Sequence, residues 1–213
     1  VSVPEMKAFK DGWFQVQDEA AQLVTILLDP QPGETVLDAC AGLGGKTGHI
    51  AQMMKNQGRI VAMDKDREKL DQLETEMKRL GISIAEPRTY DLEKPFETDF
   101  PEFDRILLDA PCSGLGVLRR NPDIKWSASQ KNLSRCRKRQ IKFLDHLTRL
   151  VKPSGVLVYA VCSTETEENE DVVTAFLEQH PEFEQLSVVN PLKTFPHIDD
   201  MDGFFSVCFK RKN

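Results

Sequence analysis

The sequence predicts an α/β fold in which helices cover both faces of a mostly parallel, seven-stranded sheet. Short apolar runs alternate along the chain with amphipathic stretches of about ten or more residues, as in βαβ units. Turn signals such as Pro32-Gly33 and Pro153-Ser154-Gly155 separate the two kinds of segment. With 213 residues, 40% of them hydrophobic, the chain can bury one core of this kind.

The short apolar runs predict seven strands. They cover residues 35–37, 59–63, 82–84, 103–108 and 156–161, with 183–189 and 204–210 as a closing antiparallel pair. The run at 82–84 is the weakest of them. The runs at 35–37 and 59–63 each follow a glycine, which marks the turn before the strand.

Amphipathic stretches predict five helices. They cover residues 18–28, 47–55, 67–80, 127–150 and 164–179. Asp66 is expected to cap the third helix, which ends before Gly81, and Thr164 with Glu167 predicts a capping box for the last helix. We therefore divide the chain into a helical lead-in over residues 1–30 and a main domain over residues 31–213.

Composition excludes several classes of protein. Five widely spaced cysteines, with no Cys-x-x-Cys and no Cys/His cluster, argue against a disulfide framework and a metal site, and favour the reducing cytoplasm. The longest apolar runs are a few residues, and the N-terminus has no signal pattern, so no membrane segment is expected. The chain begins at Val1 without a Met, so we expect it to be part of a longer protein.

Residues that can do chemistry follow the expected strands. Ligands of parallel α/β sheets bind at the carboxyl ends of the strands. The residues found there are 38–46, Asp64, Asp91, 109–114 and Cys162. Chance would place one or two such residues after strands, but not all of them, so the sequence predicts one site at that edge of the sheet.

A glycine-rich loop follows the first strand and opens a helix. It reads Asp38-Ala39-Cys40-Ala41-Gly42-Leu43-Gly44-Gly45-Lys46-Thr47. Glycine lets a backbone approach a ligand closely, and a helix N-terminus offers unpaired N–H groups. A P-loop needs glycine at the position of Cys40, and a dinucleotide motif needs it at Thr47, so neither motif is present. A glycine turn that only packs stays open as an alternative.

Asp64 ends the second strand, about 20 residues after this loop, where an acid can bind ribose hydroxyls. A helix cap is its alternative role, although Asp66 fits that role better. The loop and the acid together indicate an adenosine-containing cofactor.

The most specific stretch is Asp109-Ala110-Pro111-Cys112-Ser113-Gly114. A carboxylate at a strand end can hold the exocyclic amine or ring nitrogen of a base. Cys162 ends the next strand, so two thiols are expected to face one pocket, which indicates nucleophilic chemistry. A free thiol has a pKa of about 8.5 and needs a lower pKa to react, which a helix N-terminus can provide. A single cysteine is more often a small buried apolar residue, as we expect for Cys136 and Cys208.

These motifs resemble the Sun (Fmu) family of S-adenosylmethionine-dependent RNA cytosine-5 methyltransferases over nearly the whole chain. The marks are the glycine loop, the stretch 109–114, the stretch 119–126, Cys162-Ser163 with Glu168-Asn169-Glu170, and Asp202-Gly203-Phe204-Phe205. The chain departs from the family at Gly42-Leu43, where the family has Ala-Pro, and at Val161, where Thr is common. The resemblance implies a Rossmann-like class I methyltransferase fold.

The resemblance also implies roles for site residues. Cys162 would be the nucleophile, Cys112 would assist release, and Asp109 would hydrogen-bond the cytosine. On chemistry alone Cys112 competes as nucleophile, because DNA cytosine methyltransferases carry theirs in a Pro-Cys pair. The implied cofactor is S-adenosyl-L-methionine, with no metal, and its contacts are expected from Cys40, Ala41, Gly42, Leu43, Gly44, Gly45, Lys46, Asp64, Asp91 and Asp109.

Basic residues are concentrated in one segment of a chain whose net charge is −6. Between 119 and 142 the only acid is Asp123, against Arg119, Arg120, Lys125, Lys131, Arg135, Arg137, Lys138, Arg139 and Lys142. This pattern predicts phosphate contact, although a solvated helix face stays open. Trp126 is expected either to stack on a base or to lie in the core.

The resemblance implies an RNA partner, ribosomal RNA in particular, and an RNA-binding domain upstream of this chain. We expect no membrane partner and a monomer. Two alternatives stay open. One is a methyltransferase for another substrate such as an amino group, for which Cys162 would be dispensable. The other is an RNA-binding module without activity.

Overall fold

The computed structural model describes residues 2–96, 100–126, 128–186 and 191–213. Within these residues eight strands form one sheet in the order β3-β2-β1-β4-β5-β8-β6, and β7 pairs with β8. The strands are β1 (Thr35–Asp38), β2 (Arg59–Asp64), β3 (Ala85–Thr89), β4 (Phe103–Asp109), β5 (Val151–Val161), β6 (Phe183–Gln185), β7 (Leu192–Thr194) and β8 (Phe204–Arg211). β1 to β5 pair in parallel, whereas β8 is antiparallel to its three neighbours.

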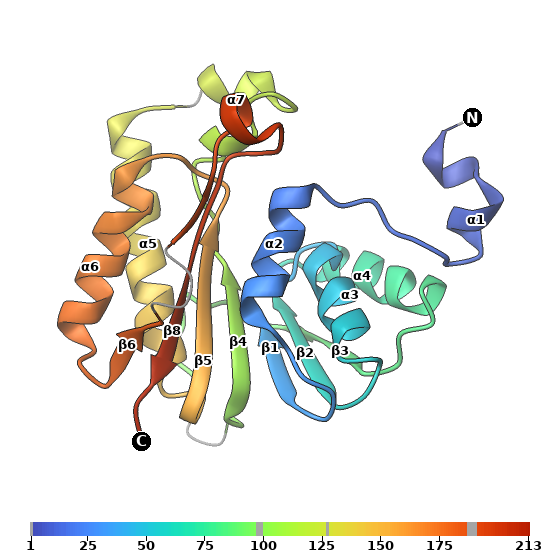
Figure 1. The fold of residues 1–213 in the computed structure, drawn as a ribbon, viewed down its shortest axis with the longest axis horizontal. Coiled ribbons are helices and arrows are strands. Elements are labelled where there is room, and N and C mark those ends of the chain that lie inside the picture. Colours follow the sequence, from blue (N-terminus) through green and yellow to red (C-terminus); the bar gives the residue numbers. More distant parts are fainter. Residues whose placement is uncertain (1, 97–99, 127, 187–190) are drawn as a thin grey trace.

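Helices lie on both faces of this sheet (Figure 1). They are α1 (Lys7–Lys10), α2 (Glu19–Leu28), α3 (Gly45–Met53), α4 (Arg67–Arg79), α5 (Gln130–Thr148), α6 (Glu170–Gln179) and α7 (Pro196–Asp199), with 3-10 helices η1 (Val3–Glu5), η2 (Leu115–Val117), η3 (Pro122–Trp126) and η4 (Thr166–Glu168). α5 and α6 cover one face, and α2, α3 and α4 cover the other. The α/β fold predicted from the sequence is confirmed.

Side-chain alternation along the strands explains the two layers. In β4, Ile106 and Leu108 join the core cluster that includes Phe143 of α5 and Phe176 of α6. Leu107 between them joins the cluster under α2 and α3. Because successive side chains of a strand point to opposite faces, an unbroken apolar run is expected only in a strand that is covered on both sides.

Polar caps set where the helices begin. The Asp66 carboxylate accepts hydrogen bonds from the backbone N–H groups of Glu68 and Lys69, so the predicted cap of α4 is confirmed. Asp18 caps α2 in the same way. α2 falls within the expected lead-in, and its Val24 and Leu28 are fully buried against the sheet.

The predicted third strand is wrong by three residues. Residues 82–84 precede β3, which is an edge strand that, in the part of the chain that the structure describes, pairs only with β2. β3 contains Pro87 and is largely exposed, so it lacks the apolar run that marks a buried strand. Ile82 and Ile84 are partly buried against the core instead.

The fifth strand also begins earlier than predicted. β5 starts at Val151, so the supposed turn Pro153-Ser154-Gly155 lies inside the strand. The pairing of β4 with β5 shifts register between Phe103 and Arg105, and Ser154 has a φ of 61°. Such a bulge accommodates a proline and a left-handed residue that a regular strand would reject.

Further differences concern the C-terminal part of the chain. The predicted capping box is absent: α6 starts at Glu170, and the hydroxyl of Ser163, not Thr164, accepts the N–H of Glu165. β7 is an eighth strand that was not predicted. The predicted strand 183–189 is confirmed for β6, while residues 187–190 lie outside the described residues, as does position 127 at the expected start of α5.

Candidate active site

A cavity of about 450 Å³ lies where β1, β2, β4 and β5 end. The carboxyl ends of these parallel strands meet at one edge of the sheet, as the fold requires. Seven residues predicted from the sequence line the cavity together: Cys40, Gly42, Asp64, Asp91, Asp109, Cys112 and Cys162.

The rest of the glycine loop faces elsewhere. Leu43, Gly44 and Gly45 border a second cavity, of about 430 Å³, next to the N-terminal segment. Ala41 packs against α4 in a small core cluster, and Lys46 turns toward Asp109. The structure therefore divides the predicted cofactor residues between two sides of the loop.

The backbone of the loop requires glycine at Gly44 and favours it at Gly42. Gly44 has a φ of 89°, and a Cβ there would lie 2.7 Å from Cγ of Leu73. Gly42 also has a positive φ, and its N–H donates to Oδ2 of Asp64 at 3.0 Å. The other oxygen of Asp64 accepts from the backbone of Asp66 at 2.9 Å. Asp64 thus fixes the loop while its side chain also lines the cavity.

The cavity suits an adenosine group. Tyr90, Leu92 and Phe143 give it apolar walls, and the carboxylates of Asp64 and Asp91 stand among them. Oδ1 of Asp91 accepts the backbone N–H of Glu93 at 3.0 Å, which orients that side chain. A largely apolar cavity with a few placed polar groups is typical of a cofactor site, and acids match ribose hydroxyls and amines.

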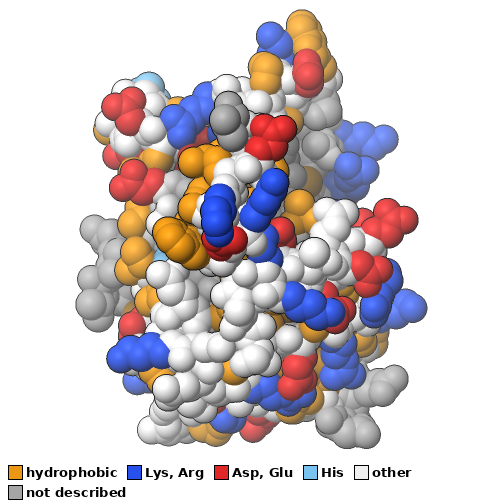
Figure 2. Space-filling model, turned by 90° about the vertical axis from the view of Figure 1, so that its right-hand side faces the viewer, with side chains coloured by type: hydrophobic (Ala, Val, Ile, Leu, Met, Phe, Trp, Pro, Cys, Tyr) orange, Lys and Arg blue, Asp and Glu red, His pale blue; other side chains and the backbone are white. Residues whose placement is uncertain are grey.

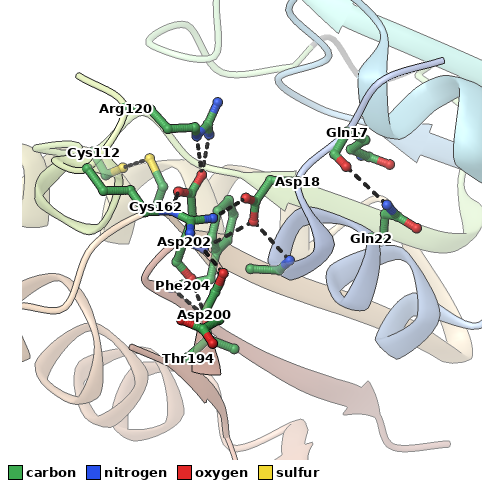
Figure 3. A network of polar contacts seen from close by, with 12 residues as sticks. Gln17, Asp18, Gln22, Cys112, Arg120, Cys162, Thr194, Asp200, Asp202 and Phe204 are labelled. Carbon is green, nitrogen blue, oxygen red and sulfur yellow. Dashed lines mark hydrogen bonds and ion pairs between the residues drawn. The ribbon is translucent and has the colours of Figure 1, made fainter. Parts of the chain in front are cut away.

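The two predicted thiols both line this cavity. Cys112 follows β4 and Cys162 follows β5, which pair in parallel with Asp109 opposite Ala160. Their Sγ atoms point toward each other and lie 3.1 Å apart (Figure 3). The strand order, with β4 next to β5, explains why two residues so distant in sequence share one pocket.

The two thiols differ in acidity. A hydrogen bond from Cys112 lowers the pKa of Cys162, and the charge of Lys46 lowers it further, which together outweigh burial and Asp109. The pKa of Cys112 is raised well above its ordinary value by that same hydrogen bond, by burial and by the negative charges of Cys162 and Glu168. Cys162 is therefore the thiol that loses its proton more easily.

An ion pair stands beside the thiols. Nζ of Lys46 lies 2.6 Å from Oδ2 of Asp109, and only 11% of the Lys46 side chain is exposed. Burial lowers the pKa of Lys46, but Asp109 outweighs burial and raises it, so the ammonium stays charged. The same Nζ lies 5.2 Å from the ring centroid of Phe204, which belongs to the Asp-Gly-Phe-Phe motif.

Asp38 begins the glycine loop and is buried behind it. Oγ1 of Thr47 donates to Oδ2 of Asp38 at 2.7 Å, whereas Oδ1 has no hydrogen-bond partner among the described residues. Burial raises the pKa of Asp38 to about 7, against the opposing effect of the Thr47 hydrogen bond. The sequence placed Asp38 in the loop without assigning it a role.

The carboxylate of Asp202 is buried and lies close to Cys162 (Figure 3). Nε of Arg119 and Nε of Arg120 donate to it at 2.9 and 2.8 Å, and Arg119 also pairs with Asp18. These two arginines, expected to contact phosphate, are thus engaged within the protein.

Gly203 and Gly116 connect the Asp202 segment to Cys162 through backbone hydrogen bonds. The N–H of Gly203 donates to the carbonyl of Gly116 at 2.8 Å, and the N–H of Gly116 donates to the carbonyl of Cys162 at 3.0 Å. A Cβ on Gly116 would collide with the carbonyl oxygen of Gly203. The close approach of these two backbones requires glycine and fixes the position of Cys162.

The other basic residues of the segment also differ in their surroundings. Lys131, Arg135 and Lys138 are exposed and line a groove along α5. Arg139 instead lines the main cavity and pairs with Glu93 at 3.2 Å. On the face that carries α1, Lys and Arg side chains are intermixed with Asp and Glu (Figure 2). Because Lys131, Arg135 and Lys138 are exposed together in the groove along α5, this groove is the candidate site for phosphate contact.

Trp126 is 79% exposed, so the core alternative for it is wrong. Nζ of Lys125 lies 4.7 Å from its ring centroid. An exposed ring next to a cation is suited to stack on a base.

Several residues around the site were not assigned a role from the sequence. Lys65, Lys69, Tyr90, Leu92 and Phe143 line the main cavity. Glu168 and Gln140 are fully buried near the thiols. Gln140 occupies a core-facing position of α5, between Leu133 and Leu147. A polar residue on the apolar face of a helix is unusual, and this feature of the sequence could have identified Gln140.

Two absences hold for the described part of the chain. No group of three or more His, Cys, Asp or Glu there is arranged to hold a metal ion. The helices of that part include none with the length and apolar character needed to cross a bilayer.

The chain is similar to known proteins in sequence and in structure. A family model described as 16S rRNA methyltransferase RsmB/F matches residues 25–210. "Probable ribosomal RNA small subunit methyltransferase B" from Bacillus subtilis (strain 168) is 42% identical over 219 residues, 96% of this chain and 49% of that protein. "Ribosomal RNA small subunit methyltransferase B" from Yersinia pseudotuberculosis serotype O:1b is 41% identical over 209 residues, 96% and 48% of the two chains. The chain spans about half the length of these curated relatives.

Solved structures agree with this similarity. The crystal structure of PH0851 superposes with a TM-score of 0.93 and 38% identity, covering 99% of this chain and 50% of that one. NSun6 from Pyrococcus horikoshii with SFG gives a TM-score of 0.90 at 30% identity, covering 100% and 57%. The predicted methyltransferase resemblance and its Rossmann-like fold are confirmed.

Proposed function

Because the chain belongs to the 16S rRNA methyltransferase RsmB/F family, we propose that it methylates carbon 5 of a cytosine in ribosomal RNA through a covalent bond to Cys162. The observation that carries this proposal is the thiol pair, 3.1 Å apart, beside the Lys46–Asp109 ion pair. Transfer to an amine or hydroxyl needs no thiol, whereas transfer to carbon 5 of cytosine needs a nucleophile to activate the ring.

The cofactor of this family is S-adenosyl-L-methionine, which supplies an electrophilic methyl group on a sulfonium sulfur. Asp64 is suited to accept the ribose hydroxyls, and Asp91 stands on the side of Tyr90 and Leu92, where the adenine would lie. The loop around Cys40 and Gly42 would face the methionine part.

The thiolate of Cys162 would add to carbon 6 of the cytosine. Formation of the S–C6 bond shifts the ring electrons so that carbon 5 becomes nucleophilic and takes the methyl group. Carbon 5 then loses its proton to solvent water, the electron pair of that C–H bond re-forms the C5–C6 double bond, and the S–C6 bond breaks to restore the Cys162 thiolate. The lowered pKa of Cys162 favours the first of these steps.

Neighbouring residues would assist in different ways. The Asp109 carboxylate, with about 30% of its side chain exposed, can accept hydrogen bonds from the base edge and favour protonation at ring nitrogen 3. Lys46 favours the thiolate by its charge. Cys112, held as a neutral thiol, would take part in release of the product.

The RNA would approach over α5. Lys131, Arg135 and Lys138 are exposed there, and Trp126 offers a ring for stacking. The target cytosine has to be single-stranded or extruded to reach the thiols that line the cavity. A cytoplasmic location and an RNA-binding domain upstream of residue 1 are part of this proposal.

The deciding experiment incubates the protein with S-adenosyl-L-methionine and 16S ribosomal RNA that carries 5-fluorocytosine. Fluorine cannot leave carbon 5 as a proton does, so a denaturation-resistant protein–RNA adduct is expected to accumulate with wild type and not with Cys162→Ala. Methyl transfer to normal RNA without any adduct would favour the amino-group alternative. RNA binding without methyl transfer would favour the inactive RNA-binding module.

A further inference from the structure

The Glu168 carboxylate is fully buried behind the turn that carries Cys112. Its Oε1 accepts the backbone N–H of Ser113 at 2.9 Å and Nε2 of Gln140 at 3.0 Å. Its Oε2 accepts the hydroxyl of Ser113, and the Cys136 thiol is a further neutral donor. All of these donors are neutral, so the oxygens of Glu168 are satisfied by hydrogen bonds and not by an ion pair.

This carboxylate joins three segments that meet around the thiols. Ser113 follows β4, Gln140 belongs to α5, and Glu168 ends η4. Nε2 of Gln140 also donates to the carbonyl of Pro111 at 3.2 Å. Both neighbours of Cys112 are therefore held through one network, Pro111 by Gln140 and Ser113 by Glu168.

Opposite charges act on the two thiols. The positive charge of Lys46 acts on Cys162, where the nearby carboxylate of Asp109 opposes it. The negative charge of Glu168 acts on Cys112. Cys136 and Tyr159 lie on the Glu168 side, and the Tyr159 hydroxyl donates to the backbone carbonyl of Glu168 at 2.7 Å. Arg139 and Cys40 line the same cavity as the two thiols.

From this arrangement we propose that Glu168 is a positioning residue of the cysteine pair, which fixes the Cys112 turn and keeps the shared proton on Cys112. On the Cys162 side Asp109 is paired with Lys46, whereas Glu168 has no ion-pair partner among the described residues, so a proton shared by the two thiols, 3.1 Å apart, should reside on Cys112. Cys162 is left as the thiolate. The proposal rests on the proposed function only in taking Cys162 as the thiol that attacks the base.

The test measures the pH dependence of alkylation by iodoacetamide at each thiol, by peptide mass spectrometry on the full chain. Wild type is expected to react at Cys162 in preference to Cys112. Glu168→Gln keeps the size of the side chain and removes its charge. The preference for Cys162 is expected to fall by about tenfold, which corresponds to one pKa unit between the thiols.

Two matched variants separate charge from packing. Glu167→Gln removes the neighbouring carboxylate, which is bonded to Gln130 at an exposed position, and is expected to leave the preference unchanged. Ser113→Ala removes one hydrogen bond to Glu168 and keeps the charge, so the preference is expected to persist. An unchanged ratio in Glu168→Gln, or an equal loss in all three variants, would overturn the proposal.

A second measurement does not depend on the folding of Glu168→Gln. In Cys162→Ala the buried Glu168 remains, so Cys112 is expected to be alkylated with a midpoint above the ordinary thiol value of about 8.5. A midpoint at or below that value would overturn the proposal. Alkylation needs neither RNA nor cofactor, so these outcomes are independent of whether the protein methylates cytosine.

Discussion

Nζ of Lys46 lies 2.6 Å from Oδ2 of Asp109, which joins the glycine loop to the end of β4. The family resemblance assigned Lys46 to the cofactor, and Asp109 to both the cofactor and the cytosine. Their ion pair couples the two binding functions, because a movement of either residue changes the charge near Cys162.

Lys46→Met is expected to raise the pKa of Cys162, because it removes a positive charge that favours the thiolate. The rising limb of the methyl-transfer rate against pH should move to higher pH, with roughly a tenfold lower rate at pH 7 for a one-unit shift. The measurement is single-turnover methyl transfer from pH 5.5 to about pH 9. Lys65→Met, which removes another lysine at the cavity, is the control, and an equal shift in both variants would contradict the specific role of Lys46.

Substitutions of Cys162 and Cys112 should block the reaction at different steps. Cys162→Ala is expected to abolish both methyl transfer and any covalent protein–RNA species. Cys112→Ala should still allow attack and transfer but stall elimination, so an adduct with ordinary RNA should accumulate on denaturing gels. A residue needed only after transfer cannot prevent the bond from forming. The opposite pattern would make Cys112 the nucleophile.

Asp64→Ala is expected to weaken S-adenosyl-L-methionine binding by about 1–3 kcal/mol in calorimetry. The substitution removes the acceptor for ribose hydroxyls and also releases the N–H of Gly42. Asp66→Ala is the matched control, because Asp66 caps α4 and does not line the cavity. It should cost about 0.5–2 kcal/mol of stability and leave the affinity unchanged. Unchanged affinity in Asp64→Ala would exclude the ribose role.

Asp38 should make stability depend on pH. Burial raises its pKa from 3.8 to about 7, so between these values the folded protein binds a proton that the unfolded chain has lost. The contribution of Asp38 to the free energy of unfolding is therefore fully present below pH 3.8 and is lost as the pH rises to about 7. Relative to Asp38→Asn, wild type should lose up to about 4 kcal/mol over this range in urea unfolding. A difference that is constant with pH would contradict the assignment.

Neutralising the exposed face of α5 should weaken the salt dependence of RNA binding. Lys131, Arg135 and Lys138 changed together to Gln remove three charges from the groove along α5. The slope of log affinity against log salt, measured by fluorescence anisotropy, is expected to fall by about 2.

The control for this triple variant has the same loss of charge elsewhere. It carries Gln at Arg59, Arg67 and Lys78, which pair with Glu86, Asp71 and Glu74. This control should keep the wild-type slope. Equal effects of both triple variants would show that net charge, not the α5 groove, governs binding.

Local signals in the sequence were enough for most of the fold. The apolar run at Ile106, Leu107 and Leu108 predicted a strand covered on both faces, because burial on each side requires it. Asp66 predicted the start of α4 because a helix N-terminus needs an acceptor. The position of the edge strand β3 was predicted wrongly, because an exposed strand need not contain an apolar run. The division of the chain into a lead-in over residues 1–30 and a main domain over residues 31–213 stays a prediction.

By itself, the sequence predicted that Asp64, Asp109, Cys112 and Cys162 belong to one site, because each lies at or shortly after the end of a parallel strand and such ends meet at one edge of the sheet. Only the tertiary structure decided the partners within that site. Lys46 meets Asp109 across 63 positions, Arg120 meets Asp202 across 82, and Ser113 meets Glu168 across 55. These contacts depend on strand order, register and the depth to which each side chain is buried, and propensity and spacing along the chain carry no information about them.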